Sequence, residues 1–392
     1  MIYPIGIQNF ESLRKDRYFY IDKTVMIHRL VHTGRYYFLS RPRRFGKSLL
    51  LSTLEAYFEG KRDLFKGLAL ERLETEWTCR PVLHLDLNIE RYDASDSLRN
   101  ILNRNLVAWE GLYGRDSSEV SLSLRFAGVI RRACERTGHR VAILVDEYDK
   151  PMLQSIGNKA LQEEFRAMLK PFYGVLKTMD GYIKFALLTG VTKFGKVSVF
   201  SDLNNLEDIS MDESYVSLCG ITEGEIHENL EEELRELAAA QKLSYEDTCA
   251  RLRALYDGYH FVENTEGIYN PFSLLNTFKR RKFGSYWFET GTPTYLVELL
   301  RRNRYRLEDM ARAVTNVDTL NSIYGDEDPL PVIYQSGYLT IKGYNPRFKT
   351  YRLGFPNEEV EEGFMKFLVP YYTPLGKDET PFAIELVTSR NG

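Results

Sequence analysis

One stretch of the sequence decides the fold, Tyr36-Tyr37-Phe38-Leu39-Ser40-Arg41-Pro42-Arg43-Arg44-Phe45-Gly46-Lys47-Ser48-Leu49-Leu50. Its aromatic and apolar beginning predicts a buried strand, and the residues from Leu49 onward predict a helix. Between them, Gly46-Lys47-Ser48 matches the second half of a phosphate-binding loop. In such a loop the glycine lets backbone N–H groups approach phosphate oxygens, and the lysine reaches the β- and γ-phosphates. The serine hydroxyl binds Mg²⁺ at the start of a helix whose dipole favours anions.

The loop departs from the consensus G-x-x-x-x-G-K-[ST] because Arg41 occupies the position of the first glycine. A Lys-Ser pair at a helix start also arises by chance, so this motif alone does not establish a nucleotide site. If the site is real, the residues that bind the nucleotide are those around the second glycine, Arg44, Phe45, Gly46, Lys47, Ser48 and Leu49.

A second motif lies at Val141-Ala142-Ile143-Leu144-Val145-Asp146-Glu147, where an apolar run ends in two carboxylates. The run predicts a buried strand that delivers acids to the edge of a sheet where ligands bind. We expect Asp146 to support the Mg²⁺ held by Ser48, and Glu147 to act as the base that orients the attacking water. The alternative is a strand that ends in ordinary solvated acids. Both motifs together, in this order, predict a nucleotide-binding protein.

A further strand is predicted over residues 182–190, and its polar end makes Thr189 the candidate sensor of the γ-phosphate. Lys193 and Lys196 follow, either opposite the phosphates or in a solvated loop. On the second predicted strand, Pro81 to Leu87, we expect His84 to be structural and leave the role of Asp86 open.

Composition sets limits on the class of protein. The chain has 392 residues, 43% of them hydrophobic, which is enough for two or three domains with real cores. The net charge of −3 excludes a global basic field for nucleic acid or anionic membrane. No apolar stretch approaches the roughly 18 residues of a membrane span, and the N-terminus lacks a signal-peptide pattern. The four cysteines form no C-x-x-C pair, so we expect reduced thiols in a cytoplasmic protein.

The alternation of strands and helices ends near residue 215. Thr222-Glu223-Gly224-Glu225 is a capping box that predicts one acidic helix through Leu237, and Asn270-Pro271 and Thr292-Pro293 predict further helix starts. Two strand-like runs, from Gln335 to Gly343 and from Phe348 to Gly354, predict a hairpin and suggest a winged helix. The expected domains are a lead-in at 1–35, an α/β P-loop core at 36–215, a helical lid at 216–290, a winged-helix-like module at 291–372 and a tail at 373–392.

Two groups of residues allow different interpretations. Phe19, Tyr20 and Ile21 either line an adenine pocket or are core aromatic and apolar residues. The basic cluster near residue 300 either meets DNA phosphates or is a solvated helix face, and its members are Arg301, Arg302, Arg304 and Arg306.

The chain resembles the AAA-ATPase-like family of bacterial proteins, which are P-loop ATPases of the additional-strand class related to archaeal-type and STAND ATPases. The resemblance covers about residues 4–372 and includes Pro4 to Phe10, Tyr20 to Thr24, Arg41 to Ser48, Val145 to Pro151, Thr189 to Val191, Tyr256 to Tyr259, Tyr269 to Ser273 and Trp287 to Pro293. It implies that Arg41 is the family's own pattern. It also implies that Lys47 and Ser48 bind phosphate and Mg²⁺, and that Asp146 and Glu147 are the metal and catalytic acids.

Many members of that family continue into a C-terminal nuclease of the PD-(D/E)xK type. Residues 354–392 contain no Glu-x-Lys or Asp-x-Lys and are too few to build such a domain, so nuclease activity is not assigned to this chain. The expected function is a Mg²⁺-dependent ATPase that acts as a switch for an attached or partner effector, a nuclease or DNA-related protein. The alternatives are a nucleotide-bound scaffold that does not hydrolyse ATP and a DNA-binding regulator that uses the winged-helix-like module. The oligomeric state is not predicted.

Overall fold

The structure is a computed structural model that describes residues 1–194, 205–289, 313–321 and 328–372, together with residues 296, 299, 300 and 303. Several predicted features lie outside these residues: Lys196, the helix start at Thr292-Pro293, the tail at 373–392 and the four arginines of the basic cluster, Arg301, Arg302, Arg304 and Arg306.

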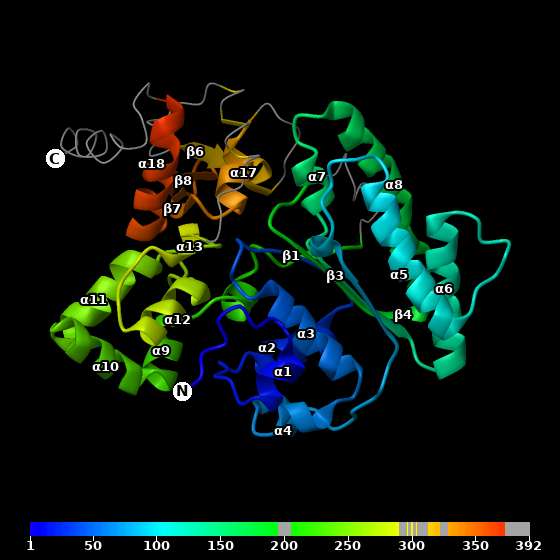
Figure 1. Ribbon diagram of the computed structural model, residues 1–392, viewed down its shortest axis with the longest axis horizontal. Coiled ribbons are helices and arrows are strands. Elements are labelled where there is room, and N and C mark those ends of the chain that lie inside the picture. Colours follow the sequence, from blue (N-terminus) through cyan, green and yellow to red (C-terminus); the bar gives the residue numbers. More distant parts are fainter. Residues whose placement is uncertain are drawn as a thin grey trace.

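A five-stranded parallel sheet forms the centre of the molecule (Figure 1). In spatial order its strands are β2 (Val82–Asp86), β3 (Val141–Asp146), β4 (Ile183–Gly190), β1 (Tyr36–Ser40) and β5 (Glu207–Asp208). Strand β4 therefore lies between the strand that leads into the phosphate loop and the strand that carries the acids. Together with its helices, this sheet gives an α/β fold of the P-loop NTPase kind, as predicted.

Helices cover both faces of the sheet, and β1, β3 and β4 are therefore buried along nearly their whole length. One group, with α3 nearest the sheet, contains α1 (Phe10–Lys15), α2 (Thr24–Thr33), α3 (Lys47–Phe58) and α4 (Ala69–Leu73). The other group lies across the sheet in Figure 1 and contains α5 (Ser97–Tyr113), α6 (Leu122–Thr137), α7 (Lys150–Gln154) and α8 (Lys159–Thr178).

A helical part follows the sheet and contains α9 (Glu223–Asn229), α10 (Glu231–Gln241), α11 (Tyr245–Tyr256), α12 (Pro271–Arg280) and α13 (Tyr286–Glu289). Both bonds of the predicted capping box are present at the start of α9. The single helix predicted through Leu237 is wrong, because Leu230 leaves the helical conformation with φ −132° and ψ 23° and separates α9 from α10. Most of these helices share a hydrophobic cluster, and Phe19 and Ile21 of the lead-in pack against it.

The C-terminal part contains an antiparallel sheet in the order β6 (Val314–Asn316), β8 (Thr350–Gly354), β7 (Thr340–Asn345), with helices α16 (Val317–Asn321), α17 (Leu330–Gln335) and α18 (Glu358–Tyr372). The predicted hairpin is confirmed. Its predicted start at Gln335 is wrong, because that residue ends α17, where an apolar run between Leu330 and Ile333 is buried as a helix. The winged-helix interpretation and the domain boundaries stay predictions.

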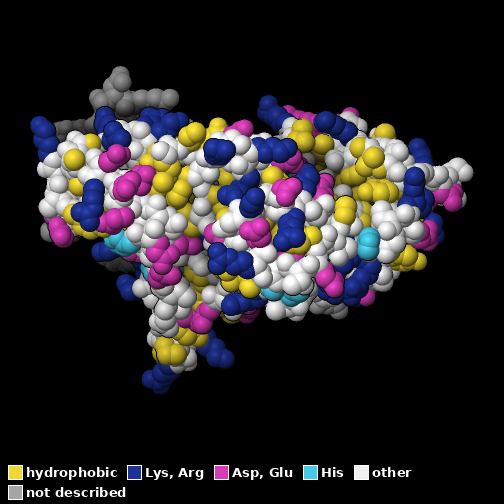
Figure 2. Space-filling view, turned by 90° about the horizontal axis from the view of Figure 1, so that it is seen from below, with side chains coloured by type: hydrophobic (Ala, Val, Ile, Leu, Met, Phe, Trp, Pro, Cys, Tyr) yellow, Lys and Arg dark blue, Asp and Glu magenta, His cyan; other side chains and the backbone are white. Residues whose placement is uncertain are grey.

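On the face shown in Figure 2, basic and acidic side chains are interspersed over the whole width of the molecule. This mixture agrees with the small net charge. Within the described ranges, no helix combines the length and the apolar character needed to cross a membrane.

Candidate nucleotide site

The phosphate loop ends where α3 begins. Gly46 is the N-cap of this helix, with φ +97°, a left-handed conformation that glycine adopts without a steric penalty. Among the described residues no side chain caps the helix, so its first N–H groups are left for a ligand. Arg44 has φ +69°, which is unusual for a residue with a side chain. The loop is thus held in a strained conformation with its amides at the start of α3.

Lys47 is nearly buried, with 4% of its surface exposed. Its ammonium donates to the carbonyl oxygens of Arg41 at 3.0 Å and Pro42 at 3.3 Å, and it lies 3.5 Å from Oε1 of Glu147. The loop's own backbone therefore orients the lysine, and its closest acid is the predicted base.

The side chains of Thr189 and Asp146 and the backbone of Glu147 meet where β3 and β4 end. Thr189 donates its hydroxyl hydrogen to Oδ1 of Asp146 at 2.8 Å, and the same oxygen accepts the N–H of Glu147 at 3.0 Å. Glu147 has φ +51°, so the chain turns sharply after Asp146. Strain of this kind in a residue with a side chain concentrates at functional sites. The two motifs, distant in sequence, converge at one edge of the sheet.

A cavity of about 850 Å³ lies over this edge. From the predicted site it is lined by Arg44, Gly46, Lys47, Ser48, Leu49 and Glu147. Asp146 and Thr189 lie behind this lining and are buried, at 5% and 0% exposure. The Ser48 hydroxyl has no hydrogen-bond partner among the described residues, which suits a ligand for a cation. The size falls within the usual range for small-molecule sites.

The walls of the cavity come from several parts of the chain, among them the lead-in, the phosphate loop, the segment after β2, the turn after β3 with α7, and α12. Ile5 and Ile7 belong to the lead-in, and Phe272 and Leu275 belong to α12, so both of these parts contribute apolar residues to the lining. Phe19, Tyr20 and Ile21 do not line the cavity. Tyr20 packs edge-on against Phe10, and Phe19 and Ile21 pack against the cluster of the helical part, so of the two alternatives for these residues the structure favours core packing. The apolar wall was missed because nothing in the local pattern of residues 4–8 distinguishes it from ordinary lead-in sequence.

A family model described as predicted AAA-ATPase matches residues 4–200, half of the 392-residue chain. This chain belongs to the AAA-ATPase-like family. Among its relatives, a protein of Azotobacter chroococcum mcd 1 named "Uncharacterized protein in vnfD 5'region" is 40% identical over 380 residues, which covers 95% of this chain and 70% of the relative. Membership of the AAA-ATPase-like family supports nucleotide binding through the phosphate loop.

Arg41 has a packing role in this AAA-ATPase-like chain. Its side chain is 1% exposed and donates to the carbonyl oxygens of Ser210 at 2.8 Å and Tyr215 at 3.2 Å. Its guanidinium carbon lies 4.0 Å from the ring centroid of Phe261. Phe45 likewise packs inward, with its ring 4.8 Å from that of Tyr259. Both side chains tie the loop to later parts of the chain, and neither lines the cavity.

Three other residues considered from sequence lie outside the cavity lining. Lys193 forms an ion pair with Asp208 on β5 and does not face the cavity. His84 makes a hydrogen bond of 3.0 Å with Glu55, which supports a structural role. Asp86 accepts the N–H of Asn88 at 2.7 Å and so begins the turn after β2.

Asp149 is a buried acid next to this site that the sequence reasoning did not single out. Its carboxylate accepts the N–H of Thr192 and the hydroxyl of Thr192, both at 2.6 Å, and the N–H of Val191 at 3.1 Å. Burial, followed by the negative charge of Glu147, raises its pKa to about 7 in spite of these bonds. Asp149 thereby holds the chain after Thr189 against the turn that carries Glu147. The only sequence signal for Asp149 was its place as the third acid in Asp146-Glu147-Tyr148-Asp149, at the end of β3.

Proposed function

We propose that this protein is a Mg²⁺-dependent ATPase that acts as a nucleotide-driven switch for an attached or partner effector, a nuclease or DNA-related protein. The observation that carries the proposal is the convergence of the ammonium of Lys47, the carboxylates of Asp146 and Glu147 and the hydroxyl of Thr189 at one edge of the sheet. The four cysteines are free thiols, which fits a reducing cytoplasm.

The residues at the cavity are suited to phosphoryl transfer to water. Mg²⁺, when bound, would neutralise charge on the phosphates, with Ser48 and Asp146 as its protein-side partners. Lys47 and the open amides at the start of α3 would stabilise the charge on the transferred group. Glu147 would accept a proton from the attacking water, with Thr189 as the γ-phosphate sensor. Phosphate oxygens would replace Glu147 as the neighbour of Lys47, which leaves that carboxylate available as a base.

Contacts from α12 to the C-terminal part support a switch. Phe272 and Leu275 of α12 line the cavity. Ser273, between them, donates its hydroxyl hydrogen to Glu359 on α18 at 2.9 Å, and the N–H of Trp287 donates to the same carboxylate at 2.8 Å. Glu359 is 1% exposed, so this link is shielded from water. A shift of α12 on nucleotide binding would therefore be transmitted to α18.

Replacement of the proposed base tests the hydrolytic function. The Glu147→Gln variant should release phosphate at least about 100-fold more slowly than the wild type, the range associated with loss of a general base. It should keep ATP affinity within a few-fold, since Lys47 and the loop are unchanged. Phosphate release and isothermal titration with ATP and Mg²⁺ measure the two quantities. Glu164→Gln, the same change at an exposed position of α8, is the matched control and should behave as the wild type.

The outcomes separate the candidate functions. Hydrolysis by Glu147→Gln at the wild-type rate would exclude Glu147 as the base. A wild-type protein that binds ATP but releases no phosphate, with or without DNA, would be the non-hydrolysing scaffold. Stimulation of phosphate release by DNA would identify DNA as the effector, whereas an unchanged rate would favour a protein effector.

A further inference from the structure

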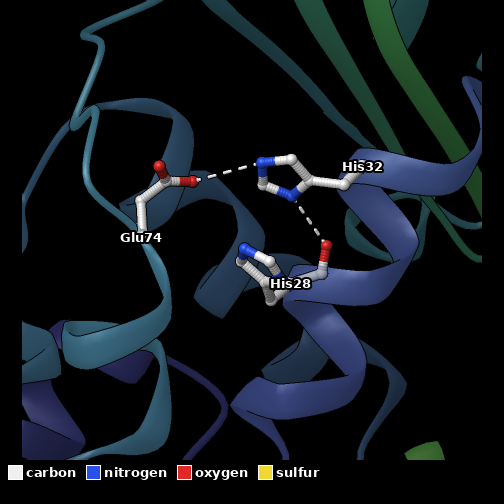
Figure 3. Close-up of side chains that lie close together, drawn as sticks. All are labelled: His28, His32 and Glu74. Atoms are coloured by element: carbon white, nitrogen blue, oxygen red, sulfur yellow. Dashed lines mark hydrogen bonds and ion pairs between the residues drawn. The ribbon is translucent and has the colours of Figure 1, made fainter.

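Two histidines and a glutamate from separate parts of the chain face one another on the side of the core away from the nucleotide cavity. His28 and His32 lie one turn apart on α2, and Glu74 follows directly after α4. Figure 3 shows all three side chains directed into the same space. One ligand atom from each residue lies within 4.8 Å of those from the other two. None of the three lines the nucleotide cavity.

The hydrogen bonding of His32 fixes which of its nitrogens is available. Nδ1 lies 2.8 Å from the carbonyl oxygen of His28, and a carbonyl only accepts, so Nδ1 carries a hydrogen. In the neutral ring the lone pair is then on Nε2, which lies 3.6 Å from Oε2 of Glu74. A hydrogen bond from the other ring nitrogen to a backbone carbonyl is the usual way in which a metal-binding histidine is oriented.

Glu74 supplies a negative charge that lacks a permanent counter-ion. The residue is 8% exposed. Its carboxylate accepts the hydroxyl hydrogen of Tyr57 at 2.6 Å and the N–H of Glu76 at 2.9 Å, and these bonds favour its ionised form. Among the residues that the structure describes, His32 is the only basic side chain within 4.0 Å of the Glu74 carboxylate, and it is charged only when protonated. Buried carboxylates are normally paired with a cation or bound to a metal.

We propose that His28, His32 and Glu74 form a binding site for a zinc-class divalent cation. Two imidazoles and one carboxylate are a known ligand set for Zn²⁺, and imidazole also suits Ni²⁺ and Cu²⁺, whereas Mg²⁺ and Ca²⁺ prefer oxygen alone. Bonds of about 2.1 Å in a tetrahedron place ligand atoms roughly 3.4 Å apart. The ligand atoms of the three residues lie within 4.8 Å of one another in the structure, so each distance between them needs to shorten by no more than about 1.4 Å to reach this geometry. The ring of His32 is stacked on that of His28, with centroids 4.1 Å apart, so the two imidazoles need to turn toward a shared cation; the 47% exposure of His32 leaves room for this turn and leaves the fourth position to water.

A cation at this position would join elements that lead into the phosphate loop. Helix α2 is followed within three residues by β1, the strand that enters the loop. Through Tyr57, Glu74 is also hydrogen-bonded near the end of α3, whose first residue is Lys47. The site therefore clamps α2, the segment after α4 and α3 together at the end of the core opposite the nucleotide. Its expected effect is on stability, with no part in the chemistry of hydrolysis.

Metal titration of the full chain tests the site. Protein stripped with EDTA and free of nucleotide is titrated with Zn²⁺, and separately with Co²⁺ as a spectroscopic probe. We expect one equivalent to bind and to raise the thermal midpoint. His28→Gln, His32→Gln and Glu74→Gln should each weaken binding by more than about tenfold, since even loss of an outer partner of a metal site typically costs 10–100-fold. His139→Gln, at an exposed histidine after α6, should bind as the wild type does.

The choice of variants separates a loss of metal binding from a loss of folding. His32 is half-exposed, so its replacement should leave the metal-free thermal midpoint unchanged. Gln at position 74 keeps one carbonyl oxygen as the acceptor for the N–H of Glu76, and its NH2 group can donate to the hydroxyl oxygen of Tyr57. The proposal is overturned if the wild type binds no Zn²⁺, or if both histidine variants bind it with wild-type affinity. Thiolate-to-Co²⁺ charge-transfer bands would also overturn it, because they would place the cation at a cysteine.

Discussion

Asp149 shows how one buried acid at the site makes stability depend on pH. Its pKa is raised from an ordinary 3.8 to about 7, first by burial and then by the charge of Glu147. Between these two values the native state binds a proton that the unfolded state has released, so stability falls as pH rises through this window, and the loss is complete above about pH 7. Asp149→Asn removes this titration and keeps an acceptor for Thr192. The variant should therefore lose less stability than the wild type between pH 4 and 8, as measured by urea unfolding at several pH values.

A second variant checks the cause of that raised pKa. Because the charge of Glu147 contributes to it, Glu147→Gln should move the pH window of the stability loss to lower pH. Parallel stability curves for wild type and Asp149→Asn would show that Asp149 titrates normally in the folded protein.

Individual residues of the candidate site could be predicted from the sequence where the motif that carries them spans only a few neighbouring positions. Lys47 and Ser48 follow Gly46 in one tripeptide, and Asp146 and Glu147 follow an apolar run, so each could be recognised within a few positions. Arg41 could not be interpreted in this way, because its partners Ser210 and Tyr215 lie about 170 residues away. Ser273 and Trp287, which both donate to Glu359, are similarly remote from it in sequence, so the link from α12 to α18 has no local signature.

At the scale of elements, the contact between β4 and the turn after β3 leaves no room for a side chain at Gly190. An added Cβ would lie 2.5 Å from Oδ1 of Asp149 and 2.7 Å from the ring of Tyr148. Gly190→Ala should therefore lower the free energy of unfolding by about 1–3 kcal/mol, the usual cost of overpacking a core. Gly174→Ala is the matched control, since Gly174 lies inside α8 with nothing within 4 Å of its Cβ position. It should stabilise the protein by about 0.5–1 kcal/mol. Equal urea midpoints for both variants would contradict the close packing of β4 on this turn.

Elements with strong end signals were predicted well. Asn270 accepts the N–H groups of Phe272 and Ser273 and begins α12 where Asn-Pro predicted a start, and Thr222 begins α9. The errors occur where apolar residues are buried by distant parts of the chain. Leu230 is 0% exposed in the cluster of the helical part and interrupts the predicted helix, although its residue type favours helix. Periodicity alone does not separate a short buried helix from a strand, which explains the error at Gln335.

At the scale of the whole molecule, the nucleotide cavity is lined by the lead-in, the segments that follow β1, β2, β3 and β4, and α12. Lys23 of the lead-in also forms a largely buried ion pair with Glu225 of α9, so the lead-in contacts the helical part directly. Burial lowers the pKa of Lys23, and Glu225 opposes that effect. The sequence predicted the sheet from its two motifs, but a cavity lined by several separated segments depends on contacts that no local pattern records.

This shared construction makes ATP a cross-link between parts of the chain that are distant in sequence. A ligand present at 100 times its Kd stabilises the bound state by about 2.7 kcal/mol, so amides that exchange only when the ligand leaves should slow by up to about 100-fold. With Mg²⁺ and ATP, hydrogen exchange of the Glu147→Gln variant should slow in residues 4–8 and in α12 as well as at the start of α3. Lys47→Ala is the control for loss of the phosphate contact and should show little slowing at the same ATP concentration. Slowing confined to residues 41–58 would mean that the nucleotide contacts the core alone, and α12 could not then carry its signal to α18.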